Sequence, residues 1–243
     1  TADNQEFRCN SGRKTMRCSR REFLHATAAG TVALLANPGS ASAVAAVPFQ
    51  LRYALASSMY GKLPLAEVLQ EVRRTGAEYF DLWPLPHANH REQVEEIGGE
   101  RFGEMLAEHR VKLGILSHYN LGPFELQSAM PFARRFGARI LVSNSRGPRD
   151  LSGEALKTEV RKFAESMKSH IAAAEENGLV IGIENHSGGL IASPDSLRWL
   201  IEMVPSRHLG IVLAPYHLEQ NAKMIAGLIE EIGERLVLFY AWQ

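Results

Sequence analysis

The alternation of short apolar runs with longer amphipathic runs, which begins at Leu51, limits the folds open to this chain. Seven short runs have the length and composition of β-strands: 51–56, 79–82, 111–116, 139–142, 180–183, 209–213 and 236–239. Longer runs with helical spacing lie between them: 65–75, 100–109, 131–136, 154–177, 194–203 and 219–229. Strands that alternate with helices predict βαβ units and a parallel sheet.

Glycines predict where several of these helices end. Thr75-Gly76, Phe136-Gly137 and Asn177-Gly178 each follow a helical run, and glycine readily adopts the left-handed conformation that closes a helix. Ser193-Pro194 predicts a helix start, because serine caps the first turn and proline suits its first position.

The pattern favours a closed barrel over an open sheet. No Gly-x-Gly-x-x-Gly motif follows the first strand, and 243 residues is close to the roughly 250 residues of a (β/α)8 barrel. An open, doubly wound α/β sheet is the alternative. The sequence stops at Gln243, just after the seventh predicted strand, so we expect a (β/α)8 TIM barrel that is C-terminally truncated after about that strand.

The first 43 residues have the features of an export signal. Ser19-Arg20-Arg21-Glu22-Phe23-Leu24 is typical of a twin-arginine motif, an apolar stretch covers 26–36, and Ala41-Ser42-Ala43 fits a cleavage site. The apolar stretch is too short for a permanent membrane span. We therefore expect a leader at 1–43 that engages the twin-arginine export machinery and a barrel domain at 44–243 that is periplasmic or extracellular. An amphipathic N-terminal helix is the alternative.

Charge and cysteine content exclude several classes of function. The first 43 residues hold six Lys and Arg against three Asp and Glu, which leaves 21 of 27 cations and 24 of 27 acids for the rest. This mildly acidic remainder argues against a nucleic-acid partner. Cys9 and Cys18 both lie in the leader, so the predicted barrel contains no disulfide and no cysteine nucleophile.

Polar and aromatic side chains gather directly after the predicted strands. They are Ser57-Ser58-Met59, Asp81-Leu82-Trp83-Pro84, Ser117-His118-Tyr119-Asn120, Ser143-Asn144-Ser145-Arg146, Glu184-Asn185-His186, Tyr216-His217 and Trp242-Gln243. The amino ends of the strands carry mostly Gly, Lys, Arg and Leu. Active sites of parallel barrels lie at the carboxyl ends of the strands, so we expect the functional site there.

These residues carry a family resemblance. Tyr79-Phe80-Asp81-Leu82-Trp83, Ser117-His118, Ile183-Glu184-Asn185-His186 and Tyr216-His217, in this order, resemble the xylose isomerase-like TIM barrel superfamily. The closest similarity is to its sugar phosphate isomerase/epimerase branch, and Glu-Asn-His is the most specific segment. The resemblance spans 51–243. It implies a small carbohydrate substrate and a divalent cation (Mn, Mg or Zn) that assists proton transfer next to a carbonyl group.

The resemblance also implies a set of metal ligands. Glu184 matches the ligand after strand five, and His217 matches the histidine of the Asp-x-x-His pattern after strand six. Ala214 stands where that pattern has its aspartate. The two remaining family ligands would fall beyond Gln243. We therefore expect Glu184 and His217 as metal ligands.

The same resemblance suggests roles for the other residues. Glu184 and His186 are the expected catalytic groups, with His186 either contacting substrate hydroxyls or orienting Glu184. The expected substrate-binding residues are Asp81, Trp83, His118, Asn185, His217 and Trp242. The alternatives are structural: an arginine partner for Glu184, a core position for His186, and barrel-mouth packing for Trp83. His87 and His90 are expected to face solvent.

Three functions are open on the sequence alone. The first is an exported isomerase or epimerase of a sugar or sugar derivative. The second is a lyase or hydrolase of oxidised glycosides, which the same proton-transfer chemistry would serve. The third is a non-catalytic carbohydrate-binding barrel that has lost its metal, which Ala214 favours.

Overall fold

The computed structural model of the chain describes residues 50–118 and 123–241. The predicted leader, with its twin-arginine motif and cleavage site, lies outside these residues. So do Tyr119, Asn120 and Trp242.

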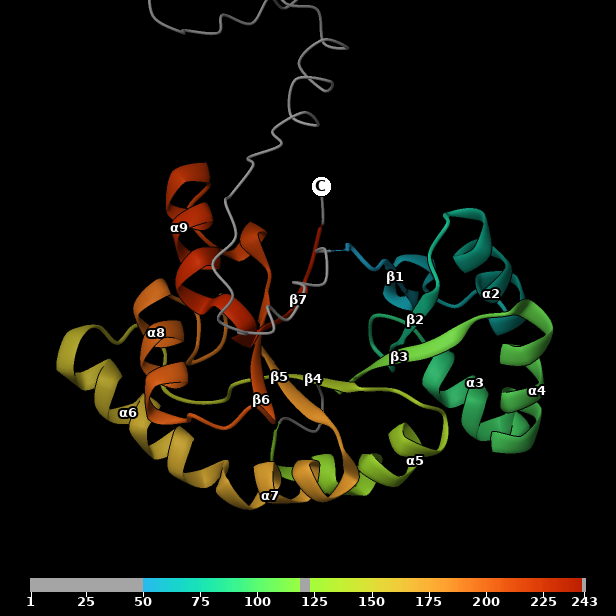
Figure 1. Cartoon of the computed structure of the whole chain (residues 1–243), viewed down its shortest axis with the longest axis horizontal. Helices are drawn as coiled ribbons and strands as arrows, with labels where there is room; N and C mark the ends of the chain where they lie inside the picture. The colour runs from blue at the N-terminus through green and yellow to red at the C-terminus, as the bar shows by residue number, and fades with distance from the viewer. Residues whose placement is uncertain (1–49, 119–122, 242–243) are drawn as a thin grey trace, which may run out of the picture. The chain divides into compact units, whose positions relative to one another are not determined.

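A single parallel sheet of seven strands forms the centre of the fold (Figure 1). The strands are β1 (Ala54–Ala56), β2 (Tyr79–Leu82), β3 (Lys112–Ser117), β4 (Ile140–Asn144), β5 (Val180–Glu184), β6 (Leu209–Leu213) and β7 (Leu236–Phe239). Each strand pairs with the next one along the chain, and the sheet curls as the strands succeed one another. This is the predicted TIM-barrel-like α/β fold, and among the described residues β1 and β7 are not paired with each other.

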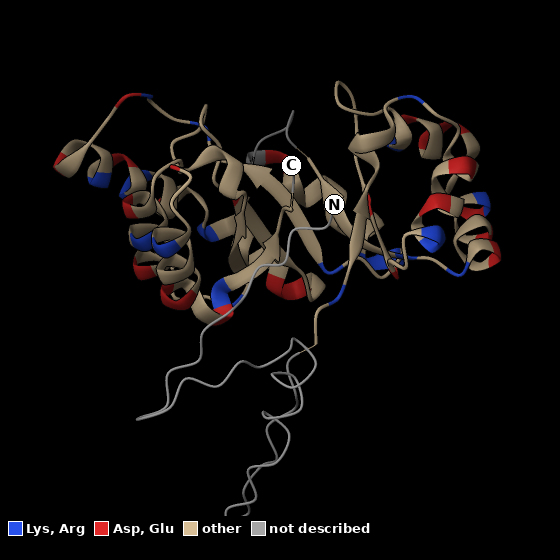
Figure 2. Cartoon of the chain, turned by 90° about the horizontal axis from the view of Figure 1, so that it is seen from above, with Lys and Arg blue, Asp and Glu red and all other residues tan. Residues whose placement is uncertain are grey.

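Helices cover the outer face of the curled sheet. They are α2 (Leu65–Arg74), α3 (His90–Ile97), α4 (Gly99–His109), α5 (Met130–Arg135), α6 (Gly153–Ser166), α7 (Lys168–Asn177), α8 (Pro194–Met203) and α9 (Ala222–Ile232), with short 3-10 turns η1 (Ser57–Tyr60), η2 (Pro123–Ala129), η3 (Pro215–His217) and η4 (Gly233–Arg235). Figure 2 shows the charged residues concentrated on these helices and their loops, while the sheet itself is mostly uncharged. No helix among the described residues is both long and apolar enough to span a bilayer.

The predicted helix ends are confirmed. Gly76, Gly137 and Gly178 have φ angles of 79°, 77° and 67°, in the left-handed region that glycine tolerates. Ser193 caps α8: its hydroxyl accepts a hydrogen bond from the backbone N–H of Ser196 at 3.3 Å.

One helix was not predicted, and one predicted helix is divided in two. The segment before Gly98 forms α3, and His90, expected to face solvent, is fully buried in it, with Nε2 2.9 Å from the carbonyl oxygen of Leu63. The single helix predicted over 154–177 is divided into α6 and α7 at Met167, whose side chain is fully buried. The division lets α6 pack against α8 while α7 packs against β5.

The core has two layers, one between sheet and helices and one inside the curl of the sheet. The inner layer contains Trp83, Ala88, Ile115, Val142, Val212, Ala214 and Tyr240. On β5, Ile181 and Ile183 belong to the outer layer, whereas a Cβ on Gly182 would meet Val212 of the inner layer at 2.6 Å. Alternate residues of a strand share a face, so Glu184 lies on the same inner side as Gly182.

Candidate functional site

Buried polar side chains line the carboxyl rim, by which we mean the residues at and just after the carboxyl ends of the strands. One group surrounds Asp81, the third residue of β2, which is 1% exposed. Its Oδ1 accepts a hydrogen bond from the Ser117 hydroxyl at 2.9 Å. Its Oδ2 accepts from Trp83 Nε1 at 2.7 Å and from the Tyr240 hydroxyl at 3.2 Å. Three donors, one at the end of β3 and two directly after β2 and β7, therefore hold this carboxyl group in place.

The environment of Asp81 changes its acidity. Burial raises the pKa of Asp81 to about 6, because the charged form loses its hydration, while the hydrogen bonds from Trp83, Ser117 and Tyr240 oppose that shift. At neutral pH the group is ionised, and its charge is already satisfied by protein donors.

A second carboxyl group, Glu184, closes β5 and is 2% exposed. Its Oε1 accepts a hydrogen bond from the Tyr216 hydroxyl at 3.1 Å. Its Oε2 is buried and has no hydrogen-bond partner among the described residues. Burial, reinforced by the negative charge of Asp81 and opposed by the Tyr216 hydrogen bond, raises the pKa of Glu184 to about 8. The rim thus presents a carboxyl group that is protonated at neutral pH.

Two imidazoles adjoin Glu184. His217 Nε2 lies 4.0 Å from Glu184 Oε1, and the rings of His217 and His186 have centroids 4.1 Å apart. His186 Nδ1 accepts a hydrogen bond from the Gly188 backbone N–H at 3.1 Å, so a neutral His186 carries its proton on Nε2. Burial lowers the pKa of both histidines, which favours their neutral forms.

Asn185 positions the turn that carries Tyr216 and His217. It is fully buried, its Nδ2 donates to the Ala214 carbonyl at 3.0 Å, and its Oδ1 accepts from the Ala214 N–H at 2.7 Å. These bonds continue the pairing of β5 with β6 past the strand ends and hold η3 over Glu184. The amide predicted to bind substrate thus makes two hydrogen bonds to the protein backbone.

Other rim residues have unmatched hydrogen-bonding atoms. Ser58 Oγ, His118 Nε2 and Asn144 Oδ1 are buried without a partner among the described residues. Burial, together with the nearby Arg91 cation, lowers the pKa of His118 to about 4, so its imidazole is neutral. With Glu184 Oε2, these atoms come from the ends of β1, β3, β4 and β5. Buried polar atoms are normally paired, so this grouping indicates a place for a polar ligand.

The structure brings together part of the predicted site. Asp81 and Trp83 share one network, and Glu184, His186 and His217 form another around Tyr216. The sequence reasoning missed the two tyrosines that bind these carboxyl groups. Tyr216 belongs to the Tyr216-His217 segment of the resemblance but has no predicted role of its own, and Tyr240 is not among the predicted site residues although it directly follows β7.

The ligand set for a divalent cation is incomplete in the described residues. No group of three or more His, Cys, Asp or Glu side chains there lies close enough together to hold a metal ion. Glu184 and His217 supply two donors, Ala214 supplies none, and the oxygens of Asp81 already accept three hydrogen bonds. Protein sites for these cations use three or more ligands, so the described residues do not fit a complete metal centre.

Comparison with known proteins agrees with the fold. The family model described as "Xylose isomerase-like TIM barrel" matches residues 69–241. A search of curated protein sequences gives no match to the chain.

Solved structures with the same architecture share little sequence with the chain. The probable 3-DHS dehydratase AsbF from Bacillus anthracis has a TM-score of 0.62 and 14% identity, covering 78% of this chain and 72% of that one. A xylose isomerase-like TIM barrel protein from Mycobacterium smegmatis in complex with magnesium has a TM-score of 0.58 and 15% identity, with 78% and 74% covered. The 3-keto-D-glucoside 4-epimerase YcjR from E. coli has a TM-score of 0.56 and 13% identity, with 74% and 76% covered.

Proposed function

This chain belongs to the xylose isomerase-like TIM barrel family, and from that premise we propose that it catalyses proton transfer next to a carbonyl group of a small sugar or sugar derivative. The reaction would be an isomerisation or epimerisation. The observation that carries the proposal is Glu184, a buried carboxyl group whose Oε2 has no partner among the described residues.

The chemistry follows from the acidity of that group. A carboxyl group with a pKa of about 8 exists in both protonation states near neutral pH, so it can donate a proton and take one back. In the ionised form, Glu184 would remove a proton from the carbon next to the carbonyl group. In the protonated form, it would return one. The hydrogen bond from Tyr216 to Oε1 leaves Oε2 for the substrate.

The remaining rim atoms suit the hydroxyl groups of a sugar. His118 Nε2, Asn144 Oδ1 and Ser58 Oγ lack partners among the described residues, and a sugar hydroxyl can both donate and accept a hydrogen bond. His186 and His217, held neutral by burial, would contact the substrate beside Glu184. The divalent cation implied by the resemblance stays a prediction, with Glu184 and His217 as two of its ligands.

A carbohydrate-binding role without catalysis is the second candidate. It is favoured by Ala214, which is fully buried and offers no ligand atom where the resembling pattern has an aspartate. Both candidates place a sugar on the carboxyl rim, and they differ in whether a carbon-bound proton exchanges with solvent.

Solvent exchange separates the two candidates. The protein is incubated with ketoses and keto-glycosides in deuterium oxide, and uptake of deuterium into the sugar is followed by NMR. We expect uptake with the unchanged protein and a loss of about 100-fold or more in Glu184→Gln, which keeps the shape of the side chain but removes the base. Glu202→Gln, on the exposed side of α8, is the matched control and should keep full exchange. Sugar binding without any uptake would establish the binding role instead.

We also propose that the protein reaches the periplasm or the extracellular space through the twin-arginine machinery. The support is the order of the basic motif at 19–24, the apolar stretch and the small-residue cleavage site. Replacing Arg20 and Arg21 together by lysine should retain the uncleaved precursor in the cytoplasm, whereas the same change at Arg13 and Arg17 should not. Normal export of the Arg20/Arg21 variant would contradict the proposal.

A further inference from the structure

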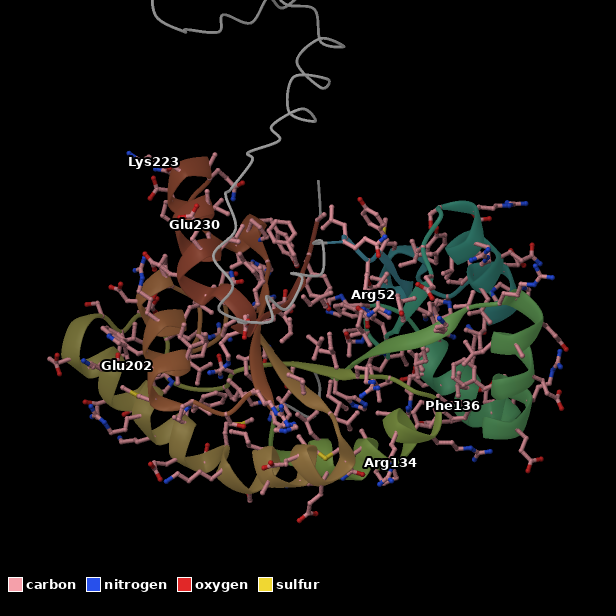
Figure 3. The ribbon with its side chains drawn as sticks, viewed as in Figure 1. Arg52, Arg134, Phe136, Glu202, Lys223 and Glu230 are labelled. Carbon is pink, nitrogen blue, oxygen red and sulfur yellow. The ribbon has the colours of Figure 1, made fainter. Side chains whose placement is uncertain are left out.

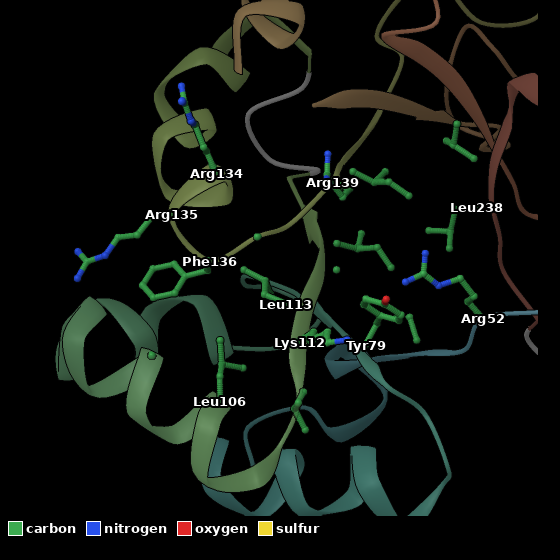
Figure 4. Close-up of a pocket in the computed structure, with 18 residues that line it drawn as sticks. Arg52, Tyr79, Leu106, Lys112, Leu113, Arg134, Arg135, Phe136, Arg139 and Leu238 are labelled. Atoms are coloured by element: carbon green, nitrogen blue, oxygen red, sulfur yellow. The ribbon is translucent and has the colours of Figure 1, made fainter. Parts of the chain in front are cut away.

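The opposite end of the sheet, where the strands begin, contains an open pocket of about 850 Å3 (Figure 4). Its lining comes from the amino ends of β1 to β4, from β7, and from α4 and the end of α5. We call it the amino-end pocket. Its volume is in the range of small-molecule sites. None of the carboxyl-rim residues discussed above lines it, so it is separate from the candidate site.

The charge of the amino-end pocket has a single sign. Its lining includes no Asp or Glu. It includes five cationic side chains, those of Arg52, Lys112, Arg134, Arg135 and Arg139. Lys112 pairs with Glu78, which lies outside the lining and whose charge also attracts Arg52. The whole chain has a formal net charge of zero, so this excess of cations is local. Figure 3 shows Arg52, Arg134 and Phe136 on the same half of the domain.

An aromatic ring lies beside two of these cations. The Arg52 guanidinium carbon is 4.6 Å from the centre of the Tyr79 ring, and Lys112 Nζ is 5.8 Å from it. The ring can lie against β3 because residue 114 is glycine. A Cβ there would come within 2.9 Å of Tyr79 Cδ1. The sequence thus provides a flat ring surface with two positive charges on it.

The rest of the lining is largely apolar. Leu113, Ile140 and Leu238 contribute aliphatic surface, and Phe136 adds a second ring with the Arg135 guanidinium 5.2 Å from its centre. A simple inorganic anion would bind the cations but leave the apolar lining exposed to water. We propose that the amino-end pocket binds an organic anion that carries a flat apolar group, such as an aromatic carboxylate or sulfonate. The anionic group would contact Arg52 and Arg139, and the apolar group would cover the aliphatic wall.

The test uses naphthalene-2-sulfonate as the probe and calorimetric titration of the full chain. We expect saturable binding that is about tenfold or more tighter than that of inorganic phosphate or of uncharged naphthalene-2-methanol, since each lacks one of the two features. Arg52→Glu with Arg139→Glu should weaken it by about tenfold or more. Arg161→Glu with Arg207→Glu, which reverses two exposed arginines outside the pocket, should leave it unchanged.

Two results would overturn the proposal. One is unchanged binding of naphthalene-2-sulfonate in the Arg52/Arg139 charge reversal, and the other is phosphate binding as tight as that of the sulfonate. Because a double charge reversal can disturb folding, the neutral pair Arg52→Gln with Arg139→Gln is measured beside it. That pair should weaken binding in the same direction while the protein keeps its cooperative thermal transition.

Discussion

The two ends of the parallel sheet place their charged groups in opposite environments. At the carboxyl rim, Asp81 and Glu184 are almost fully buried, and the pKa values of both rise because the ionised forms lose water. At the amino end, the pocket cations are exposed, and Glu78, the only acid paired with any of them among the described residues, has a side chain that is 47% exposed. Water screens exposed charges, whereas burial makes each missing or added partner costly. The rim therefore holds carboxyl groups whose protonation depends on burial, whereas the amino end holds cations that stay in contact with water.

The sharpest contrast should come from removing one acid at each end. Asp81→Ala leaves the Trp83 indole, the Ser117 hydroxyl and the Tyr240 hydroxyl without their buried acceptor, so we expect the unfolding free energy to fall by about 3 kcal/mol or more. Glu78→Ala, at the amino end of β2, removes an exposed ion pair and should change little. Chemical denaturation measures both. Equal losses would mean that burial does not separate the two ends.

The interior between the two ends should tolerate no added volume. A Cβ on Gly210 of β6 would stand 2.4 Å from Val237 Cγ1 and 2.9 Å from the Arg235 carbonyl oxygen. We expect Gly210→Ala to lower the unfolding free energy by about 1–3 kcal/mol. Gly227→Ala on α9, where the added Cβ meets nothing within 4 Å, should raise it by about 0.5–1 kcal/mol. A neutral Gly210→Ala would show that the inner layer is loosely packed.

A smaller effect is expected from adding the carboxylate that the resembling metal-binding pattern has at position 214. Ala214→Asp adds a carboxylate beside Glu184 and His217, and we expect it to tighten Mn2+ binding about tenfold in a calorimetric titration. Ala214→Asn adds the same volume without the charge and should tighten it less. If both variants bind Mn2+ as the unchanged protein does, position 214 does not face the cation.

The sequence was sufficient for the fold because its signals are local. The bounds of β2, β6 and β7 match the predicted runs, and the capping glycines stand where the periodicity ends. The missed helix α3 shows the limit: its charged sequence hides that His90 and Val94 are buried. The division at Met167 could not be predicted from the sequence either, because helix-forming residues continue through it. The two helices are separate because they follow different directions along the curved sheet.

The site was less predictable because its key contacts join distant segments. Asp81 and Glu184 could be chosen from their places near the carboxyl ends of strands, but their acidities depend on burial. Tyr240 reaches Asp81 across 159 residues of sequence, and Tyr216 reaches Glu184 across 32. Asn185 is predicted to bind substrate, and the sequence alone does not show that it also holds the backbone of Ala214, because that contact depends on the register of β5 with β6.

The pH dependence of stability gives a first view of the protonation state of Glu184. Between pH 4.5 and about 8, the folded state holds a proton on Glu184 that the unfolded state has released. The unfolding free energy of the unchanged protein should therefore fall as pH rises through this window, relative to that of Glu184→Gln. The difference should grow by up to a few kcal/mol and then level off.

The carboxyl titration of Glu184 itself tests the central claim most directly. Protein labelled with 13C at the glutamate carboxyl carbons is titrated by NMR, and the signal that disappears in Glu184→Gln identifies the residue. We predict a midpoint of about 8 for this signal, well above the ordinary glutamate value of 4.5. A Glu184 midpoint near 4.5 would contradict it, because the rim would then hold an ordinary carboxylate and no proton donor at neutral pH.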